Sequence, residues 1–172
     1  MRILFLGDVV GISGCSKILN NLKSEIKKKN INFVIVNGEN SAEPGVGLTE
    51  EICNDFFNCG VDVITTGNHV WDQKEIMSFI EKENRLLRPH NLFEPSPGKG
   101  FEIYETHNHL KVGVLNLMGN VFMKKCEDVF EISKKFLKNH QLKEDYDLLI
   151  VDFHGEITSE KNAIGHFFDG KA

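Results

Sequence analysis

Short apolar runs alternate with stretches of helical periodicity along most of this 172-residue chain. The first run, Ile3 to Leu6, is followed by Gly7-Asp8, a pattern typical of a buried strand and the turn that ends it. Apolar side chains then recur at helical spacing over residues 18–26, which predicts a helix that crosses back over a sheet. The predicted strands of this kind are 3–6, 32–36, 61–65 and 146–151, and the predicted helices contain residues 18–26, 49–57, 76–80, 129–137 and 159–168.

The middle of the chain has a different pattern. Residues 88–100 hold several prolines and glycines, so we expect an irregular segment there. Residues 101–106 and 110–117 are β-patterned and are separated by His107-Asn108-His109, which predicts a hairpin. The other predicted strands are each followed by a helix, and this alternation predicts an α/β fold built from parallel βαβ units.

Side chains that bind metals follow four of the predicted strands. They are Asp8, Glu39 with Asn40, Asn68 with His69, and His154. Right-handed crossovers bring the carboxyl ends of parallel strands to one edge, where open α/β sheets bind ligands. Asp and Asn are also ordinary turn residues, so Asp8 alone is better explained as part of a turn. Turn chemistry does not explain Glu39 or His154, and the coincidence of four strand ends therefore favours a metal site.

The ligand types narrow the kind of metal site. A mixture of carboxylate, amide oxygen and imidazole suits iron, manganese or zinc with open coordination positions, whereas a closed structural zinc site prefers cysteine. A two-metal site needs a carboxylate that bridges ions about 3.5 to 4 Å apart. Glu39 is the candidate for that bridge.

Composition limits the class of protein further. With 41% hydrophobic residues, residues 1–172 are enough for one domain with a proper core. A net charge of −5 argues against binding to duplex nucleic acid or to an anionic membrane. The four cysteines form no Cys-x-x-Cys pair and no apolar run is long enough for a membrane span, so we expect reduced thiols in a cytoplasmic protein.

At this point the sequence resembles a known family. The segments that carry the resemblance are Gly7-Asp8-Val9-Val10-Gly11, Asn37-Gly38-Glu39-Asn40, Gly67-Asn68-His69-Val70-Trp71-Asp72, Val151-Asp152-Phe153-His154-Gly155-Glu156 and Ser159-Glu160-Lys161. In this order they are similar to the bacterial YmdB-like branch of the calcineurin-like metallophosphoesterases, which contains the 2',3'-cyclic-nucleotide 2'-phosphodiesterases. The resemblance implies a layered α/β/β/α fold.

The resemblance also implies a site with two divalent metal ions, iron or manganese. In the family pattern, Asp8 and Asn40 would serve one ion, Glu39 would bridge, and Asn68 and His154 would serve the other. The implied reaction opens a 2',3'-cyclic nucleotide to a nucleoside 3'-phosphate through attack by a metal-bound hydroxide. His69 would be the general acid that protonates the 2'-oxygen.

The chain departs from the family pattern at its end. Members of the family continue into one more strand with a Gly-Thr-His-Thr-His motif, whose two histidines complete the metal pair, and this chain has no such motif. We therefore expect a fold that lacks its last strands, with an incomplete domain at the C-terminus and an uncovered sheet edge. A separately encoded C-terminal segment or a homo-oligomer is the expected partner. The alternative function is a catalytically incomplete fragment or a non-enzymatic remnant.

The other histidines and motifs fit a catalytic or ligand role less well. His107 and His109 have the spacing of a ligand pair but lie at a predicted hairpin tip, His166 lies in a helical pattern, and His90 is most simply a solvated loop residue. The chain contains no phosphate-binding P-loop, no dinucleotide fingerprint and no nucleophile elbow. A metal-dependent phosphodiesterase is thus the prediction.

Overall fold

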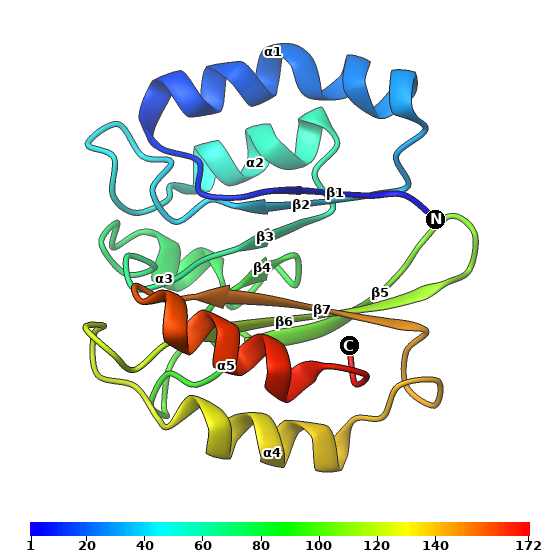
Figure 1. Ribbon diagram of the computed structural model, residues 1–172. Coiled ribbons are helices and arrows are strands. Elements are labelled where there is room, and N and C mark those ends of the chain that lie inside the picture. The colour runs from blue at the N-terminus through cyan, green and yellow to red at the C-terminus, as the bar shows by residue number, and fades with distance from the viewer.

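Two β-sheets face each other between outer helices in the computed structural model, which describes residues 1–172 (Figure 1). Helices α1 and α2 lie above the sheets in this view, and α4 and α5 lie below them. The strands are β1 Ile3–Leu6, β2 Phe33–Asn37, β3 Val63–Thr65, β4 Leu86–Leu87, β5 Phe101–Glu105, β6 Lys111–Met118 and β7 Leu148–His154. The helices are α1 Gly11–Lys29, α2 Glu50–Cys59, α3 Ile76–Phe79, α4 Val129–Asn139 and α5 Thr158–Phe168.

The first sheet contains β1, β2, β3 and β4 in that order, and all of its strands are parallel. Every residue of β2 is buried, as expected for a central parallel strand covered on both faces. Asn37 and Thr65 are partners at the ends of β2 and β3, so the turns that follow these strands begin side by side. Strand β4 was not predicted, because a segment of two leucines is too short to show an alternating pattern.

The second sheet contains β5, β6 and β7. Strands β5 and β6 form the predicted antiparallel hairpin, and β6 pairs with β7 in parallel. The expectation of a single sheet edge is therefore wrong in detail. The strands divide between two sheets, and the carboxyl ends of β1, β2, β3 and β7 instead meet at one end of the sandwich, on the left of Figure 1.

The predicted end of the last strand is also corrected. We expected it to stop at Val151, but β7 continues through Asp152 to His154, which pairs in register with Met118. The pairing of β7 with β6 continues through polar residues, because backbone hydrogen bonds to β6 are available along this whole segment. As a result, His154 is the last residue of a strand rather than part of the following turn.

The core has three layers. One apolar cluster lies between the first sheet and helices α1 to α3, and another lies between the second sheet and helices α4 and α5. The cluster between the sheets consists of Phe33, Ile35, Val63, Leu87, Val112 and Val114. The α/β/β/α layering implied by the family resemblance is thus confirmed.

Capping residues fix where the helices begin. The Thr49 hydroxyl accepts a hydrogen bond from the Ile52 backbone nitrogen at 3.2 Å, so the predicted cap of α2 is confirmed. Asp128 caps α4 in the same way through two backbone nitrogens. Helix α3 contains only four residues and follows turns over residues 71–75.

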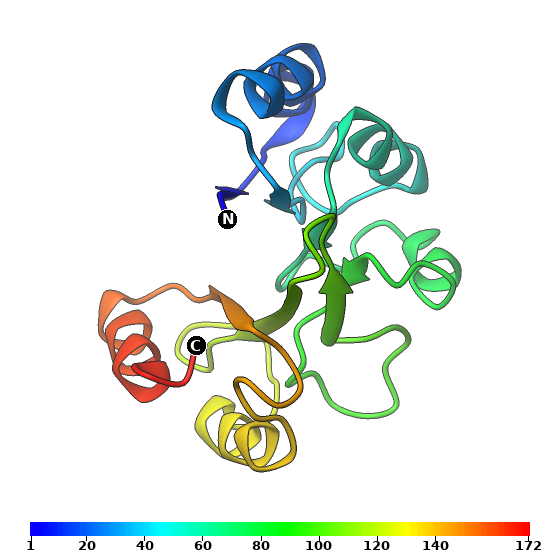
Figure 2. The same ribbon diagram turned by 90° about the vertical axis from the view of Figure 1, so that its right-hand side faces the viewer.

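The outer strands of the two sheets are left uncovered. Strand β1 pairs only with β2, and β7 pairs only with β6, in line with the expected open edge at β7. Figure 2 shows both termini on the same side of the molecule. None of the helices combines enough length with enough apolar sequence to cross a membrane.

Candidate active site

The turns after β1 and β2 are bound to each other. The Val9 backbone nitrogen donates to the Asn37 carbonyl at 3.0 Å, and the Asn40 amide nitrogen donates to Asp8 Oδ1 at 3.0 Å. Asp8 has φ = 31°, a region that residues other than glycine rarely adopt and that recurs at functional sites. Two of the predicted ligands, Asp8 and Asn40, are therefore in direct contact.

Glu39 lies at the centre of the cluster. Its side chain is completely buried, and Oε1 lies 2.9 Å from His154 Nε2 and 3.4 Å from the Asn40 amide nitrogen. Oε2 accepts a hydrogen bond from the His69 backbone nitrogen at 3.3 Å. Glu39 thus contacts the turns after β2 and β3 and the end of β7.

Gly67 makes room for this carboxylate. A Cβ atom at position 67 would lie 2.2 Å from Glu39 Oε2 and 2.6 Å from the His154 ring, closer than nonbonded atoms approach. Only glycine allows the backbone of the turn after β3 to come this near to both side chains. The Gly-Asn-His turn therefore depends on its glycine for packing as well as on its polar residues for chemistry.

His154 and Asn68 join the two sheets. His154 Nε2 lies 2.8 Å from Asn68 Oδ1 as well as 2.9 Å from Glu39. Burial by itself would lower the pKa of His154, but the hydrogen bond to Glu39 and the negative charges of Glu39, Asp152 and Asp8 outweigh burial and raise it. Negative charge therefore dominates the electrostatics of this end of the sandwich.

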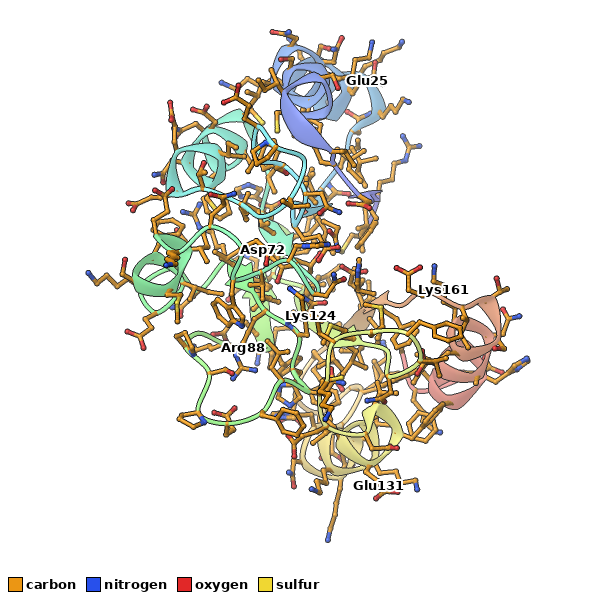
Figure 3. The ribbon with its side chains drawn as sticks, turned by 90° about the vertical axis from the view of Figure 1, so that its left-hand side faces the viewer. Glu25, Asp72, Arg88, Lys124, Glu131 and Lys161 are labelled. Carbon is orange, nitrogen blue, oxygen red and sulfur yellow. The ribbon has the colours of Figure 1, made fainter.

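His69 is held at one ring nitrogen. Its Nδ1 lies 2.6 Å from Asp72 Oδ2, so Nε2 is the nitrogen free to meet a ligand. Lys124 Nζ donates to Asp72 Oδ1 at 3.2 Å and to the Asn68 carbonyl at 2.7 Å. The His69 contact, followed by Lys124, lowers the pKa of Asp72. Figure 3 shows Asp72 and Lys124 close together at the centre of this face.

Two of the residues in this network were missed by the sequence reasoning. Lys124 is 52 residues from Asp72 in the chain and lies in a loop without periodicity, so nothing in the sequence pointed to it. Asp152 accepts a hydrogen bond from the Asn37 amide at 3.0 Å, and burial raises its pKa. A signal for Asp152 was present, because it lies two residues before His154 and therefore on the same strand face.

The chemistry of the cluster fits a divalent cation. Asn40 Oδ1 is buried without a hydrogen-bond partner, and such an orphaned acceptor is costly unless a cation or a donor satisfies it. Asp8, Glu39 and Asp152 supply negative charge around one imidazole. No three His, Cys, Asp or Glu side chains are arranged to hold a metal ion by themselves, so the amide oxygens of Asn40 and Asn68 are needed in the ligand set.

The site opens to solvent between the ends of the outer strands. A cleft of about 450 Å³ runs from Asp8 at the end of β1 to His154 at the end of β7, and Lys161 of α5 forms part of its wall. Asn37 and Asp152 lie in the same wall. Of the predicted ligands, Asp8 and His154 line this cleft, whereas Glu39 is buried.

The remaining histidines are engaged elsewhere. His109 lies at the tip of the β5–β6 hairpin and contacts Glu105 at 2.7 Å, and His166 is an exposed residue of α5. The expectation for His90 is wrong, because its ring is not solvated but packs edge-on against Phe136. Burial lowers the pKa of His90. All four cysteines are free, as predicted.

The layered fold and the strand-end cluster define a class. Two facing sheets that present carboxylate, amide and imidazole side chains at one end have the fold of the calcineurin-like metallophosphoesterases. A crystal structure of a hypothetical protein from Thermus thermophilus matches with a TM-score of 0.90 and 34% identity, over 100% of this chain and 65% of the other. A crystal structure from Mycoplasma pneumoniae, described as a novel phosphatase, matches with a TM-score of 0.87 and 38% identity, over 99% and 60%.

The family follows from the sequence match. The chain belongs to the YmdB-like protein family, whose family model matches residues 4–172. It is 41% identical to the 2',3'-cyclic-nucleotide 2'-phosphodiesterase of Bacillus subtilis (strain 168) over 172 residues. That match covers 100% of this chain and 64% of the relative, so the chain spans less than two thirds of the relative's length.

Proposed function

We propose that the protein is a metal-dependent phosphodiesterase that opens 2',3'-cyclic nucleotides to nucleoside 3'-phosphates. The contact of buried Glu39 with Asn40, His154 and the Gly-Asn-His turn carries this proposal. The name of the Bacillus subtilis relative supports the substrate class. The description of the Mycoplasma pneumoniae structure as a phosphatase supports the wider class of reaction.

The metal ions would be held by the strand-end cluster. Asp8 and Asn40 would serve one ion, Asn68 and His154 would serve the other, and Glu39 would bridge them. Asn40 would use its unpartnered Oδ1. When bound, a pair of iron or manganese ions supplies Lewis acidity toward phosphoryl oxygens and an activated water.

His69 would act as the general acid. Its Nδ1 is occupied by Asp72, so Nε2 would carry a proton toward the 2'-oxygen as the cyclic phosphate opens. Asp72 fixes the direction of the His69 ring, while Lys124 holds Asp72 and the Asn68 carbonyl in place. The chain's own residues thus supply orientation and the proton.

Further features of the metal-loaded enzyme stay predictions. These are the preference for iron or manganese, a cytoplasmic location, and a single domain over residues 1–172. A homo-oligomer or a separately encoded C-terminal segment is the proposed partner at the open edge of β7.

A second candidate is a catalytically incomplete protein that keeps part of the pocket. The observation that favours it is the ligand set, in which His154 is the only imidazole among the proposed metal ligands and no three His, Cys, Asp or Glu side chains are arranged to hold a metal. Such a site would bind metal more weakly than one with an imidazole for each ion. The protein would then bind nucleotides without turning them over.

One experiment separates the two candidates. The purified chain is assayed for bound iron, manganese and zinc, and for hydrolysis of 2',3'-cyclic AMP with each metal added, with His69→Ala as the matched control. Turnover by the wild type that exceeds the control at equal metal content supports the phosphodiesterase. Absence of transition metal together with turnover at the level of the control supports the incomplete protein.

A further inference from the structure

A second cleft adjoins the Gly-Asn-His turn. It has a volume of about 220 Å³ and is lined by residues from the segments 67–71 and 92–96 and by Met118, Lys124 and Lys125. Gly67 and Asn68 form part of its wall, so the same turn borders both this cleft and the metal-ligand cluster. Asn68 is thus both a proposed metal ligand and a wall residue of this cleft.

Aromatic side chains form the apolar part of the wall. Phe93 lines the cleft and is 54% exposed, which is unusual for a phenylalanine, because its ring loses the hydrophobic stabilisation of burial. Trp71 also lines the cleft and is half-buried against the first core cluster. The exposed Phe93 ring is an apolar face of the kind on which nucleobases stack.

Two lysines form the polar part of the wall. Lys124 and Lys125 both line the cleft, in a chain whose net charge is −5. Lys124 is engaged with Asp72 and the Asn68 carbonyl, whereas the exposed Lys125 side chain is the one placed for an anionic ligand. The cleft therefore combines aromatic and positively charged lining residues in a chain that is negative overall.

We propose that this cleft is the nucleoside subsite, in which the base of the substrate stacks on Phe93 and Lys125 contacts its phosphate. The inference rests on the proposed function and adds a position for the base. The volume is below the roughly 300 to 1,000 Å³ of pockets for drug-sized ligands, so the cleft suits one nucleoside rather than an oligonucleotide. Phe93 would then determine the preference for nucleotides over other phosphodiesters.

The single tryptophan makes the proposal measurable without catalysis. Trp71 is the only tryptophan of the chain, so a base in the cleft changes its fluorescence. Adenosine 3'-monophosphate is titrated into the chain in EDTA, with correction for nucleotide absorbance, and is expected to quench the signal saturably. Because stacking on one aromatic ring is worth about 5- to 150-fold in affinity, Phe93→Ala should weaken binding by at least about fivefold. Lys125→Met should weaken binding of the nucleotide more than binding of adenosine.

Phe122→Ala is the matched control. Phe122 is 85% exposed in the same region of the structure but does not line the cleft, so its removal should leave the affinity unchanged. Equal affinity of Phe93→Ala and wild type, or equal losses in Phe93→Ala and Phe122→Ala, would overturn the proposal. Unchanged thermal unfolding shows that a loss of affinity is not a loss of fold.

A kinetic comparison distinguishes failure of this subsite from failure of the proposed function. For an active preparation, Phe93→Ala should lose at least about fivefold more kcat/KM with 2',3'-cyclic AMP than with bis(p-nitrophenyl) phosphate, which has no nucleobase. Equal losses with the two substrates would contradict the subsite. Absence of turnover with both substrates in the wild type contradicts the proposed function, and the fluorescence titration then decides the subsite alone.

Discussion

His154 Nε2 lies 2.8 Å from Asn68 Oδ1, although His154 ends β7 of the second sheet and Asn68 lies in the turn after β3 of the first. The contact exists because β3 and β7 end at the same end of the sandwich. Neither sheet contains the whole set of proposed ligands, so the relative position of the sheets determines the geometry of the site. Asn116, which donates from β6 to the Thr66 and Leu87 carbonyls of the first sheet, helps to fix that position.

Gly67→Ala should destabilise the protein and disrupt the site. The added Cβ would meet Glu39 Oε2 and the His154 ring, and overpacking of this kind costs about 1–3 kcal/mol. Urea unfolding measures the loss. Gly165→Ala is the control, because nothing lies within 4 Å of its Cβ inside α5, and it should stabilise the helix by about 0.5–1 kcal/mol. Similar stability of the two variants would contradict the crowding at position 67.

Glu39→Gln should abolish stabilisation by metal while keeping the fold. The substitution preserves the shape of a fully buried side chain but removes the charge that would join two cations. A metal at one hundred times its dissociation constant stabilises the folded state by about 2.7 kcal/mol, so added Mn²⁺ should raise the Tm of the wild type.

Glu160→Gln is the control for removing the charge of a buried glutamate. Glu160 is also buried, but it accepts hydrogen bonds from the Asn120 and Val121 backbone nitrogens and is not one of the proposed ligands. Its variant should keep the Mn²⁺-dependent rise in Tm, measured by calorimetry with and without EDTA. A rise in Glu39→Gln as large as that in the wild type would refute the role of Glu39.

Asp72→Asn should slow turnover more than it alters stability. Asp72 and His69 are each about 30% exposed in their side chains, and partly exposed ion pairs contribute about 0–1 kcal/mol. Loss of the carboxylate removes the partner that fixes the imidazole, so kcat should fall about 10- to 100-fold with a smaller change in KM. The fraction of His69 with a proton on Nδ1, measured by ¹⁵N NMR, should fall in parallel.

Lys124 gives this prediction an internal check. Lys124→Ala should reproduce part of the effect on kcat and on the His69 proton position, because the second oxygen of Asp72 loses its partner. Lys124→Arg should restore both. A fall in kcat in Asp72→Asn without any change in the NMR signal would show that the aspartate does not act through His69.

Asp62→Asn should change how stability depends on pH. Burial raises the pKa of Asp62, against the opposing hydrogen bond from the Val34 backbone nitrogen and the charges of His107 and Arg85. A folded-state pKa above the unfolded value means that the neutral form favours folding, so its contribution is present below about pH 3.9 and is lost as the pH rises through the folded pKa. The variant should therefore gain stability relative to the wild type between about pH 4 and pH 7.

This change in relative stability is tested by urea unfolding of the wild type and Asp62→Asn at about pH 4 and pH 7. Other groups titrate equally in the two proteins, so their contributions cancel in the difference. A constant difference between the variant and the wild type across this pH range would show that Asp62 has no raised pKa in the folded state.

Much of the fold could be predicted because the spacing of apolar residues and the residue types of turns are set by neighbouring positions in the sequence. The run Ile3–Leu6 and the cap at Thr49 each indicate an element within a few residues. The assignment of strands to two sheets could not be predicted from the residue pattern, because buried strands of either sheet have the same apolar pattern. Only the family resemblance implied it.

The candidate site also has a part that the sequence predicted and a part that it did not. Asn68 and His154 were found because each follows an apolar run in the sequence. The hydrogen bond from Lys124 to Asp72 was not found, because a contact across 52 residues depends on how two loops meet. The solvated environment expected for His90 was wrong for the same reason, since Phe136 lies on a distant helix.

The position of Glu39 between the two sheets has a kinetic consequence. Ions held by Glu39, Asn68 and His154 would connect the first and second sheets across their open end, so neither sheet could separate from the other before the ions leave. The lifetime of the folded chain would then follow the dissociation rate of the metal, and resistance to proteolysis would report the occupancy of the site in a crude extract.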